Sequence, residues 1–480
     1  MPEPLRIAIV GHTNTGKTSL MRTLTRDVGF GDVSSGPGTT RDVAGARLFA
    51  DGAVRVELFD TPGLEDPIAL LERLEAIGDE GGRDRGKRLD AVARIEGFLE
   101  SPGAGGRFEQ EAKVLRQMLA SDAAFYVVDA RDPVLAKHRD ELAILGGCAI
   151  PLLPVLNFVR DPAANETTWR EALARLGLHA VVRFDTVAPE CDGERRLYEK
   201  LATLVDAHRP ALERLVASRE REALARHAAG LRLIAELLID VAAARVGVAI
   251  DPESAMRAAI AGLHEQVRRR EQACVDALLA LYRFRAHELE AAGLPLLDGR
   301  WESDLFNPET FRTMGVRLGS GAAAGAAAGV GIDLMFGGLT LGAAAALGAL
   351  AGGGWQALRQ FGDRMLGRLR GERELSVDDA ALRLLALRQM QLLRALEARG
   401  HAAIAPIRLV DPGERQWREG PLPDPLRDAR AHPEWSVMSV VLGGEAGRER
   451  AVRDEAVRDA AGREDAVAVL AERLELPPDR

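Results

Sequence analysis

The sequence predicts an α/β domain with a mostly parallel sheet flanked by helices, followed by a mainly α-helical region. Short apolar runs, such as 7–10 and 123–128, are each followed by a segment of helical pattern in the first part of the chain. This alternation is typical of a sheet whose parallel strands are joined by helices. From residue 194 onward leucines recur at intervals of three and four, which indicates helices.

A chain of 480 residues is long enough for two or more domains. We expect the α/β domain at 1–190, with a helical insertion at about 65–120, and a helical domain at 191–315. A Gly/Ala-rich apolar helical hairpin at 316–354 and a helical C-terminal region with a short strand at 355–480 complete the expected organisation.

Three local features of the helical region are also predicted. Pro210 should kink or divide the helical pattern that begins at Glu194. A helix is expected from Ser376, whose side chain would cap it, to Gly400, which would end it. The Pro-rich segment 419–433 is predicted to be a loop.

A glycine-rich loop after the first apolar run carries the clearest chemistry. It has glycine at 11 and 16, then Lys17 and Thr18, in the spacing of a phosphate-binding loop. Its backbone N–H groups can converge on phosphate oxygens at a helix N-terminus. Lys17 should reach the β- and γ-phosphates, and the Thr18 hydroxyl should bind Mg²⁺. The expected nucleotide contacts are Gly11, His12, Thr13, Asn14, Thr15, Gly16, Lys17, Thr18 and Ser19.

Two segments downstream fit the same site. The loop "SSGPGTTRD" holds Thr39 and Thr40, and one of these hydroxyls could coordinate Mg²⁺ when a γ-phosphate is present. The strand "VRVELF" then leads into Asp60-Thr-Pro-Gly63. Asp60 is placed to hold the Mg²⁺ shell through water, and the Gly63 N–H to sense the γ-phosphate.

In this order and spacing, the phosphate loop, "PGTTRD" and "DTPG" resemble the TrmE–Era–EngA class of bacterial P-loop GTPases over roughly residues 5–188. The resemblance implies hydrolysis of GTP to GDP and phosphate with Mg²⁺. It implies Thr40 as the switch ligand, with Thr39 as the alternative, and Lys17, Thr40 and Gly63 as the catalytic residues. It also implies a K⁺ ion at Asn14, whose alternative role is to stabilise the loop.

The pattern departs from the class at two places. Leu64 stands where many regulatory GTPases carry a glutamine that orients water, so a backbone group, a cation or a second chain must complete the site. The expected Asn-Lys-x-Asp reads Asn157-Phe-Val-Arg-Asp161, with the acid one residue late. Asn157 and Asp161 are assigned to the base by resemblance, and guanine specificity follows from the class alone.

Charge and cysteine content limit the partners and the compartment. The chain has 63 basic and 72 acidic residues, a net charge of −9, so we expect no nucleic-acid partner. Its 3 cysteines form neither a zinc pattern nor a disulfide framework, which indicates a reducing cytoplasm. The N-terminus lacks a basic segment, so no signal peptide is expected.

The hairpin at 316–354 is expected to form two apolar helices that turn near "VGID". Its glycines recur at spacings of four, which lets helix backbones approach closely. Three interpretations are open: the hairpin enters a membrane, crosses one, or packs in a soluble bundle. Ala and Gly provide little transfer energy, and Asp333 adds a cost. We favour association with the inner membrane from the cytoplasmic side.

These features favour a membrane-associated GTP switch that turns over slowly until a homodimer or an activating protein completes its site. One alternative is a nucleotide-gated binding module with little turnover. Another is a ribosome-assembly GTPase like Era, which the acidic net charge and the lack of a basic tail disfavour.

Overall fold

The computed structural model describes residues 3–26, 42–85, 90–186, 192–249, 253–284, 296–297, 299–314, 316, 332–334, 372–398, 417, 421–439 and 452–475. The chain divides into two compact units, whose main boundary lies between Leu224 and Ala225. Helix α8, Arg209–Ala243, contributes residues to both units.

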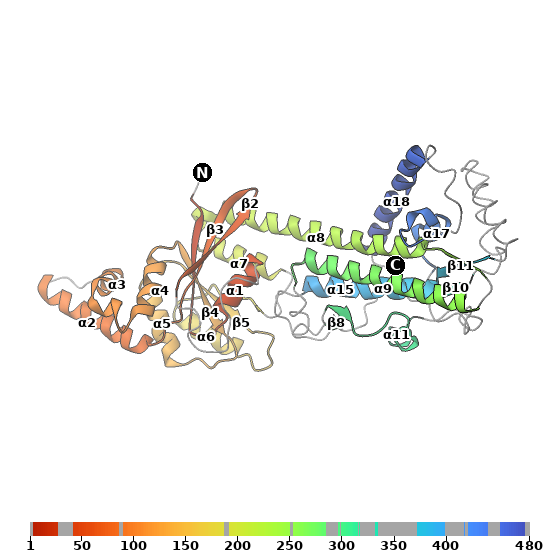
Figure 1. Ribbon diagram of the computed structural model, residues 1–480. Coiled ribbons are helices and arrows are strands. Elements are labelled where there is room, and N and C mark those ends of the chain that lie inside the picture. Colours follow the sequence, from red (N-terminus) through yellow and green to blue (C-terminus); the bar gives the residue numbers. More distant parts are fainter. Residues whose placement is uncertain are drawn as a thin grey trace. The chain divides into compact units, whose positions relative to one another are not determined.

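A six-stranded sheet forms the centre of the first unit, in the order β2-β3-β1-β4-β5-β6 (Figure 1). Five strands are parallel, and β2 pairs antiparallel with β3 at one edge. The predicted α/β class with a mostly parallel sheet is confirmed. The strands are β1 Leu5–Val10, β2 Ala44–Ala50, β3 Ala53–Asp60, β4 Ala123–Asp129, β5 Leu152–Asn157 and β6 Val182–Arg183.

Helices cover both faces of this sheet because its central strands are apolar on both sides. Ile7 and Ile9 of β1 belong to the core beneath α1, α7 and the start of α8, whereas Ala8 and Val10 belong to the core beneath α2 to α6. The helices are α1 Lys17–Thr25, α2 Pro67–Arg85, α3 Ala91–Glu100, α4 Glu109–Leu119, α5 Ala136–Gly146, α6 Glu166–Arg175 and α7 Gly193–Ala202.

The first unit extends beyond the expected boundary at 190. Leu197 of α7 and Leu212 of α8 are fully buried in the same core as β1, so this helical segment completes the α/β unit. The short helix η2, Asp206–His208, separates α7 from α8, and Pro210 is the second residue of α8. A proline at that position lacks only an N–H that the helix does not use, so Pro210 divides the helices rather than kinking one.

The second unit is mainly helical, as predicted, and packs around one apolar core. A three-stranded antiparallel sheet in the order β10-β11-β7 and a two-stranded ribbon of β8 and β9 accompany the helices. Beside the second part of α8 its elements are β7 Val246–Ala249, α9 Glu253–Leu281, β8 Leu296–Leu297, β9 Arg300–Trp301, α11 Pro308–Thr313, β10 Ile332–Leu334, β11 Glu372–Val377, α15 Asp379–Ala398, α17 Asp424–Ala431, η4 Pro433–Trp435 and α18 Val452–Glu475.

Three local predictions for this unit are wrong. Strand β10 lies where the hairpin was expected to turn, since Asp333 pairs with Ser376 of β11. Ser376 is therefore part of a strand, and Asp378 caps α15 by accepting a hydrogen bond from the N–H of Ala381 at 2.7 Å. The segment expected as a loop contains α17, whose first residues include Pro425.

Most of the predicted 316–354 hairpin lies outside the described residues, as do Gly400 and the short strand expected near 402–410. Among the helices that are described, none combines the length and the apolar character that a membrane span requires.

Candidate functional site

The phosphate loop joins β1 to α1 and needs glycine at both ends. Gly11 has φ 141° and Gly16 has φ 92°, angles that favour glycine. A Cβ atom on Gly11 would lie 2.4 Å from the carbonyl oxygen of Val127, and one on Gly16 would lie 2.3 Å from Nδ2 of Asn157. The loop therefore packs closely against β4 and the end of β5. A larger residue at either glycine would force the loop or its neighbours to shift.

Lys17 is buried in the first turn of α1. Its Nζ donates to the carbonyl oxygens of Gly11 at 3.1 Å and His12 at 2.7 Å. Burial lowers the pKa of Lys17 to about 8, against the opposing effect of the carboxylates Asp60 and Glu141. The ammonium is thus held within the loop, where phosphate oxygens would be stronger acceptors than the two carbonyls.

Thr18 and Asp60 meet beside Lys17 and fit a divalent cation. The Thr18 hydroxyl donates to Oδ2 of Asp60 at 2.6 Å. Asp60 is buried, and among the described residues its Oδ1 has no hydrogen-bond partner. Burial raises the pKa of Asp60, which the Thr18 hydrogen bond and the Lys17 charge oppose. Hydroxyl and carboxylate oxygens are the ligands that Mg²⁺ prefers, and an unpartnered carboxylate oxygen can hold one of its waters.

The segment after Asp60 lies directly against the phosphate loop. The Thr61 hydroxyl donates to the carbonyl oxygen of Ile9 at 2.7 Å, which fixes this segment to β1. A Cβ atom on Gly63 would lie 2.8 Å from the backbone N of Thr13. Leu64 is fully buried in the core beneath α2 to α6, so its side chain is directed away from any phosphate.

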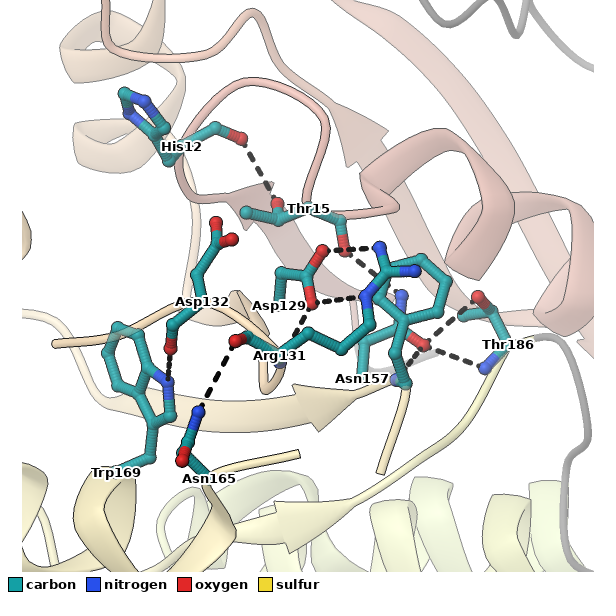
Figure 2. Close-up of polar contacts among 10 residues, drawn as sticks. His12, Thr15, Asp129, Arg131, Asp132, Asn157, Asn165, Trp169 and Thr186 are labelled. Carbon is teal, nitrogen blue, oxygen red and sulfur yellow. Dashed lines mark hydrogen bonds and ion pairs between the residues drawn. The ribbon is translucent and has the colours of Figure 1, made fainter. Parts of the chain in front are cut away.

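Asn157, the last residue of β5, connects the phosphate loop to the segment that follows β6. Its Nδ2 donates to the carbonyl oxygen of Thr15 at 3.0 Å, and its Oδ1 accepts from Thr186 N at 2.9 Å and Thr186 Oγ1 at 3.1 Å (Figure 2). Asp161 does not join this network. It is exposed, and its Oδ1 accepts from the N–H of Ala163 at 2.8 Å in a local turn.

The remaining predicted residues fall into two groups. Asn14 is exposed with φ 62°, and among the described residues its side chain makes no hydrogen bond. Ser19 follows in the first turn of α1. Thr39 and Thr40, the two candidates for the switch ligand, lie outside the described residues.

A buried polar network lies behind the loop. Nδ1 of His12 is 2.7 Å from Oε1 of the buried Glu141, and Nε2 is 2.8 Å from Nζ of Lys137. The hydroxyl of Tyr126 donates to the other oxygen of Glu141 at 2.8 Å. Because the Lys137 ammonium can only donate, Nε2 of His12 is the acceptor in that contact, which leaves Nδ1 to donate to Glu141. Helix α5 is thereby hydrogen-bonded to the phosphate loop.

Two known protein families match this chain. A family described as "50S ribosome-binding GTPase" matches residues 6–157, and one described as "Domain of unknown function (DUF3482)" matches residues 170–459. The chain belongs to the DUF3482 family. Together with the motif geometry, the first match identifies the N-terminal unit of this DUF3482 member as a P-loop GTPase domain of the class predicted from its sequence.

The DUF3482 chain is also similar to curated proteins and solved structures. The tRNA modification GTPase MnmE of Granulibacter bethesdensis is 32% identical over 236 residues, 48% of this chain and 47% of that protein. That of Alkalilimnicola ehrlichii is 31% identical over 155 residues, 31% of this chain and 33% of that protein. The chain thus spans less than half the length of these relatives.

Among solved structures, Era of Aquifex aeolicus bound to GDP and AlF₄⁻ is 17% identical, with a TM-score of 0.27, over 38% of this chain and 50% of that one. The G domain of the FeoB iron transporter of T. maritima is 19% identical, with a TM-score of 0.24, over 42% of this chain and 99% of that one.

Several residues of the DUF3482 site were missed from the sequence. Glu111 of α4 accepts hydrogen bonds from the N–H groups of Glu65 at 3.1 Å and Asp66 at 3.0 Å, which holds the chain after Gly63. Glu141 and Arg131 were missed as well. An acidic residue on an amphipathic helix ordinarily faces solvent, so only a buried position in the helix pattern could have signalled the roles of Glu111 and Glu141. Arg131 lies in the turn after β4, where no helix pattern applies.

Proposed function

We propose that the chain binds GTP and hydrolyses it to GDP and phosphate with Mg²⁺. The observation that carries the proposal is the buried Asp60 beside Thr18, whose Oδ1 has no hydrogen-bond partner among the described residues. When bound, Mg²⁺ supplies positive charge next to the β- and γ-phosphates. Lys17 binds the same phosphates, Asp60 orients water around the ion, and the Gly63 N–H contacts the γ-phosphate.

The decisive experiment is calorimetry of GTP binding with Mg²⁺, combined with phosphate release. Lys17→Ala should weaken binding by at least about 100-fold, because charge-assisted phosphate contacts are lost. Lys200→Ala, an exposed lysine on α7, serves as the matched control and should bind as the wild type does. Unchanged affinity in the Lys17 variant would refute the assignment. A preference for ATP would refute GTP as substrate, and binding without turnover would favour the nucleotide-gated module.

We propose that potassium assists turnover through Asn14. The support is the exposed side chain of Asn14, which makes no hydrogen bond within the described part of the chain, and the burial of Leu64, an apolar residue that cannot orient water. A monovalent cation can supply the missing charge stabilisation. Turnover should be several-fold faster in K⁺ than in Na⁺, and Asn14→Ala should remove the difference. Equal rates in the two salts would leave Asn14 without this role.

We also propose that the switch acts at a membrane through residues 316–354, with a homodimer or an activating protein completing the site. The support is compositional: between Arg317 and Arg359 the sole charged residue is Asp333. Ribosome binding is a second candidate because the matching family carries that description. Nucleotide-dependent co-sedimentation with ribosomes would favour it over membrane binding.

A further inference from the structure

Arg131 follows the end of β4, and its planar, positively charged guanidinium lies beside the phosphate loop. Its Nε donates to Oδ1 of Asp129 at 2.9 Å and its terminal NH2 nitrogen donates to Oδ2 at 2.6 Å (Figure 2). This two-pronged contact fixes the plane of the guanidinium. The guanidinium carbon also lies 4.0 Å from the ring centroid of Phe158. One edge and one face of the guanidinium are therefore occupied by the protein.

Phe158 is held in an unusual conformation that brings its ring to the loop. Its φ is 55°, a left-handed angle that is strained for a bulky residue. The N–H of Phe158 donates to Oδ1 of Asn157 at 2.9 Å, which stabilises this conformation. A Cβ atom on Gly16 would lie 3.5 Å from Cζ of the ring. Strain of this kind persists where the surroundings impose it, and it is concentrated at functional sites.

The position of this pair relative to the phosphates favours the base side of a nucleotide. In open parallel sheets, ligands bind outside the carboxyl ends of the strands where the strand order reverses, here between β3 and β4 on either side of β1. The Asp60–Gly63 segment after β3 lies against Thr13 and serves the phosphate end. The opposite side, after β4 and β5, carries Arg131 and Phe158, and Asp129 is paired with Asn157 across these strands.

Within the described part of the chain, the hydrogen bonds and the ring contact of the Arg131 guanidinium engage one edge and one face. The side chain is nevertheless 42% exposed. Planar guanidinium groups stack well on aromatic rings, and every nucleobase offers such a face. Asp161, the acid expected to read guanine, is exposed, and its Oδ1 accepts a hydrogen bond from the N–H of Ala163.

We propose that the purine base of the bound nucleotide stacks on Arg131, with Phe158 as its support, and that this stack replaces the lysine and much of the aspartate recognition of the class. The proposal rests on the nucleotide binding proposed above. Stacking does not distinguish guanine from adenine, so the GTP preference over ATP is expected to be small, about tenfold or less.

The test compares nucleotides with a probe that has no base. GTP, ATP and inorganic tripolyphosphate are titrated with Mg²⁺ into wild type, Arg131→Ala, Arg131→Lys and Phe158→Leu. Loss of stacking should lower the affinity for GTP and ATP by about tenfold to hundredfold, and the affinity for tripolyphosphate should stay within about twofold of the wild-type value. Arg131→Lys keeps the positive charge but lacks the planar guanidinium, so it should lower the affinity for both nucleotides nearly as much as the alanine variant does. If the alanine variant does not fold, the lysine variant is used for the test.

Two control variants sharpen the result. Arg6→Ala removes another arginine that lies over a ring, 5.3 Å from the centroid of Phe59, and should change no affinity. Asp161→Asn should alter GTP and ATP binding equally little. The inference is overturned if the Arg131 variants bind GTP as tightly as the wild type does, or if their affinity for tripolyphosphate falls as much as their affinity for GTP. It is also overturned if Asp161→Asn lowers the affinity for GTP but not for ATP. Failure of wild type to bind both GTP and tripolyphosphate would instead refute the proposed function.

Discussion

At the scale of single residues, the burial of Lys17 has a consequence for pH. Its pKa is about 8 in the nucleotide-free protein, because burial disfavours the charged form. Phosphate oxygens favour the ammonium, so the pKa of Lys17 should be higher in the complex. Between these two pKa values the complex binds more protons than the free protein, and GTP affinity should fall as the pH rises above about 8.

Calorimetry at about pH 8.5, in two buffers with different heats of ionisation, measures this proton uptake. The apparent binding enthalpy should differ between the buffers in proportion to the protons taken up. Identical enthalpies would show that Lys17 does not change protonation on binding.

Gly63 provides a second test at this scale. A Cβ atom there would lie 2.6 Å from Cγ2 of Thr13 and 2.8 Å from its backbone N, so Gly63→Ala must separate the two segments. We expect a loss of about 1–3 kcal/mol in the free energy of unfolding and a weaker triphosphate complex. Gly146→Ala, in α5, is the control because no atom lies within 4 Å of the added methyl group. Chemical denaturation and GTP titration check both variants. If Gly63→Ala has the stability and the GTP affinity of the wild type, the close approach of Gly63 to Thr13 is refuted.

At the scale of elements, helices α9 and α15 share a buried ion pair. Nε of Arg388 lies 3.2 Å from Oε1 of Glu271, and the two side chains are 2% and 6% exposed. Gln389 donates to the same carboxylate at 3.2 Å, and the guanidinium lies 4.4 Å from the ring centroid of Trp301. Burial raises the pKa of Glu271 to about 7 and lowers that of Arg388, so each charge depends on the other.

Removing one partner should therefore cost more than removing both. Glu271→Leu or Arg388→Met alone leaves a buried charge and should lower the free energy of unfolding by about 3–5 kcal/mol. The double variant should recover most of that loss, since apolar side chains of similar size replace the pair. A double-mutant cycle by denaturation measures the coupling. Additive single effects would mean that the two side chains do not stabilise each other.

At the scale of the whole molecule, membrane binding depends on residues 316–354. Strand β10 lies within this segment and pairs with β11, so deleting the segment would also remove a strand of the second unit. Charged substitutions at Ala324 and Ala345 are the better test, because a charge opposes transfer of either expected helix into lipid. Ala174→Lys, at an exposed position of α6, is the control.

Liposome flotation with GTP and with GDP measures the membrane proposal. The wild type and the control should float with the lipid, and the double charge variant should not. A nucleotide effect requires that GTP and GDP differ in affinity for the two arrangements of the hairpin, so flotation should differ between the two states. If the intact folded protein floats in neither state, the membrane proposal is wrong.

What the sequence determined by itself is local in the chain. The phosphate loop, the strand before it and the position of Asp60 at a strand end follow from short motifs, because eight residues suffice to specify the turn and the helix start. The helices of the second unit follow from the periodicity of their leucines.

What only the tertiary structure decided depends on residues far apart. Arg131 meets Phe158 because β4 and β5 are neighbours, and Glu141 meets His12 because α5 packs behind the loop. Ser376 became part of a strand because it pairs with Asp333 of β10, while the preceding residues of β11 pair with β7, and this outweighs its preference as a helix cap. Such pairings are set by strand order and burial, and no short stretch of sequence encodes either.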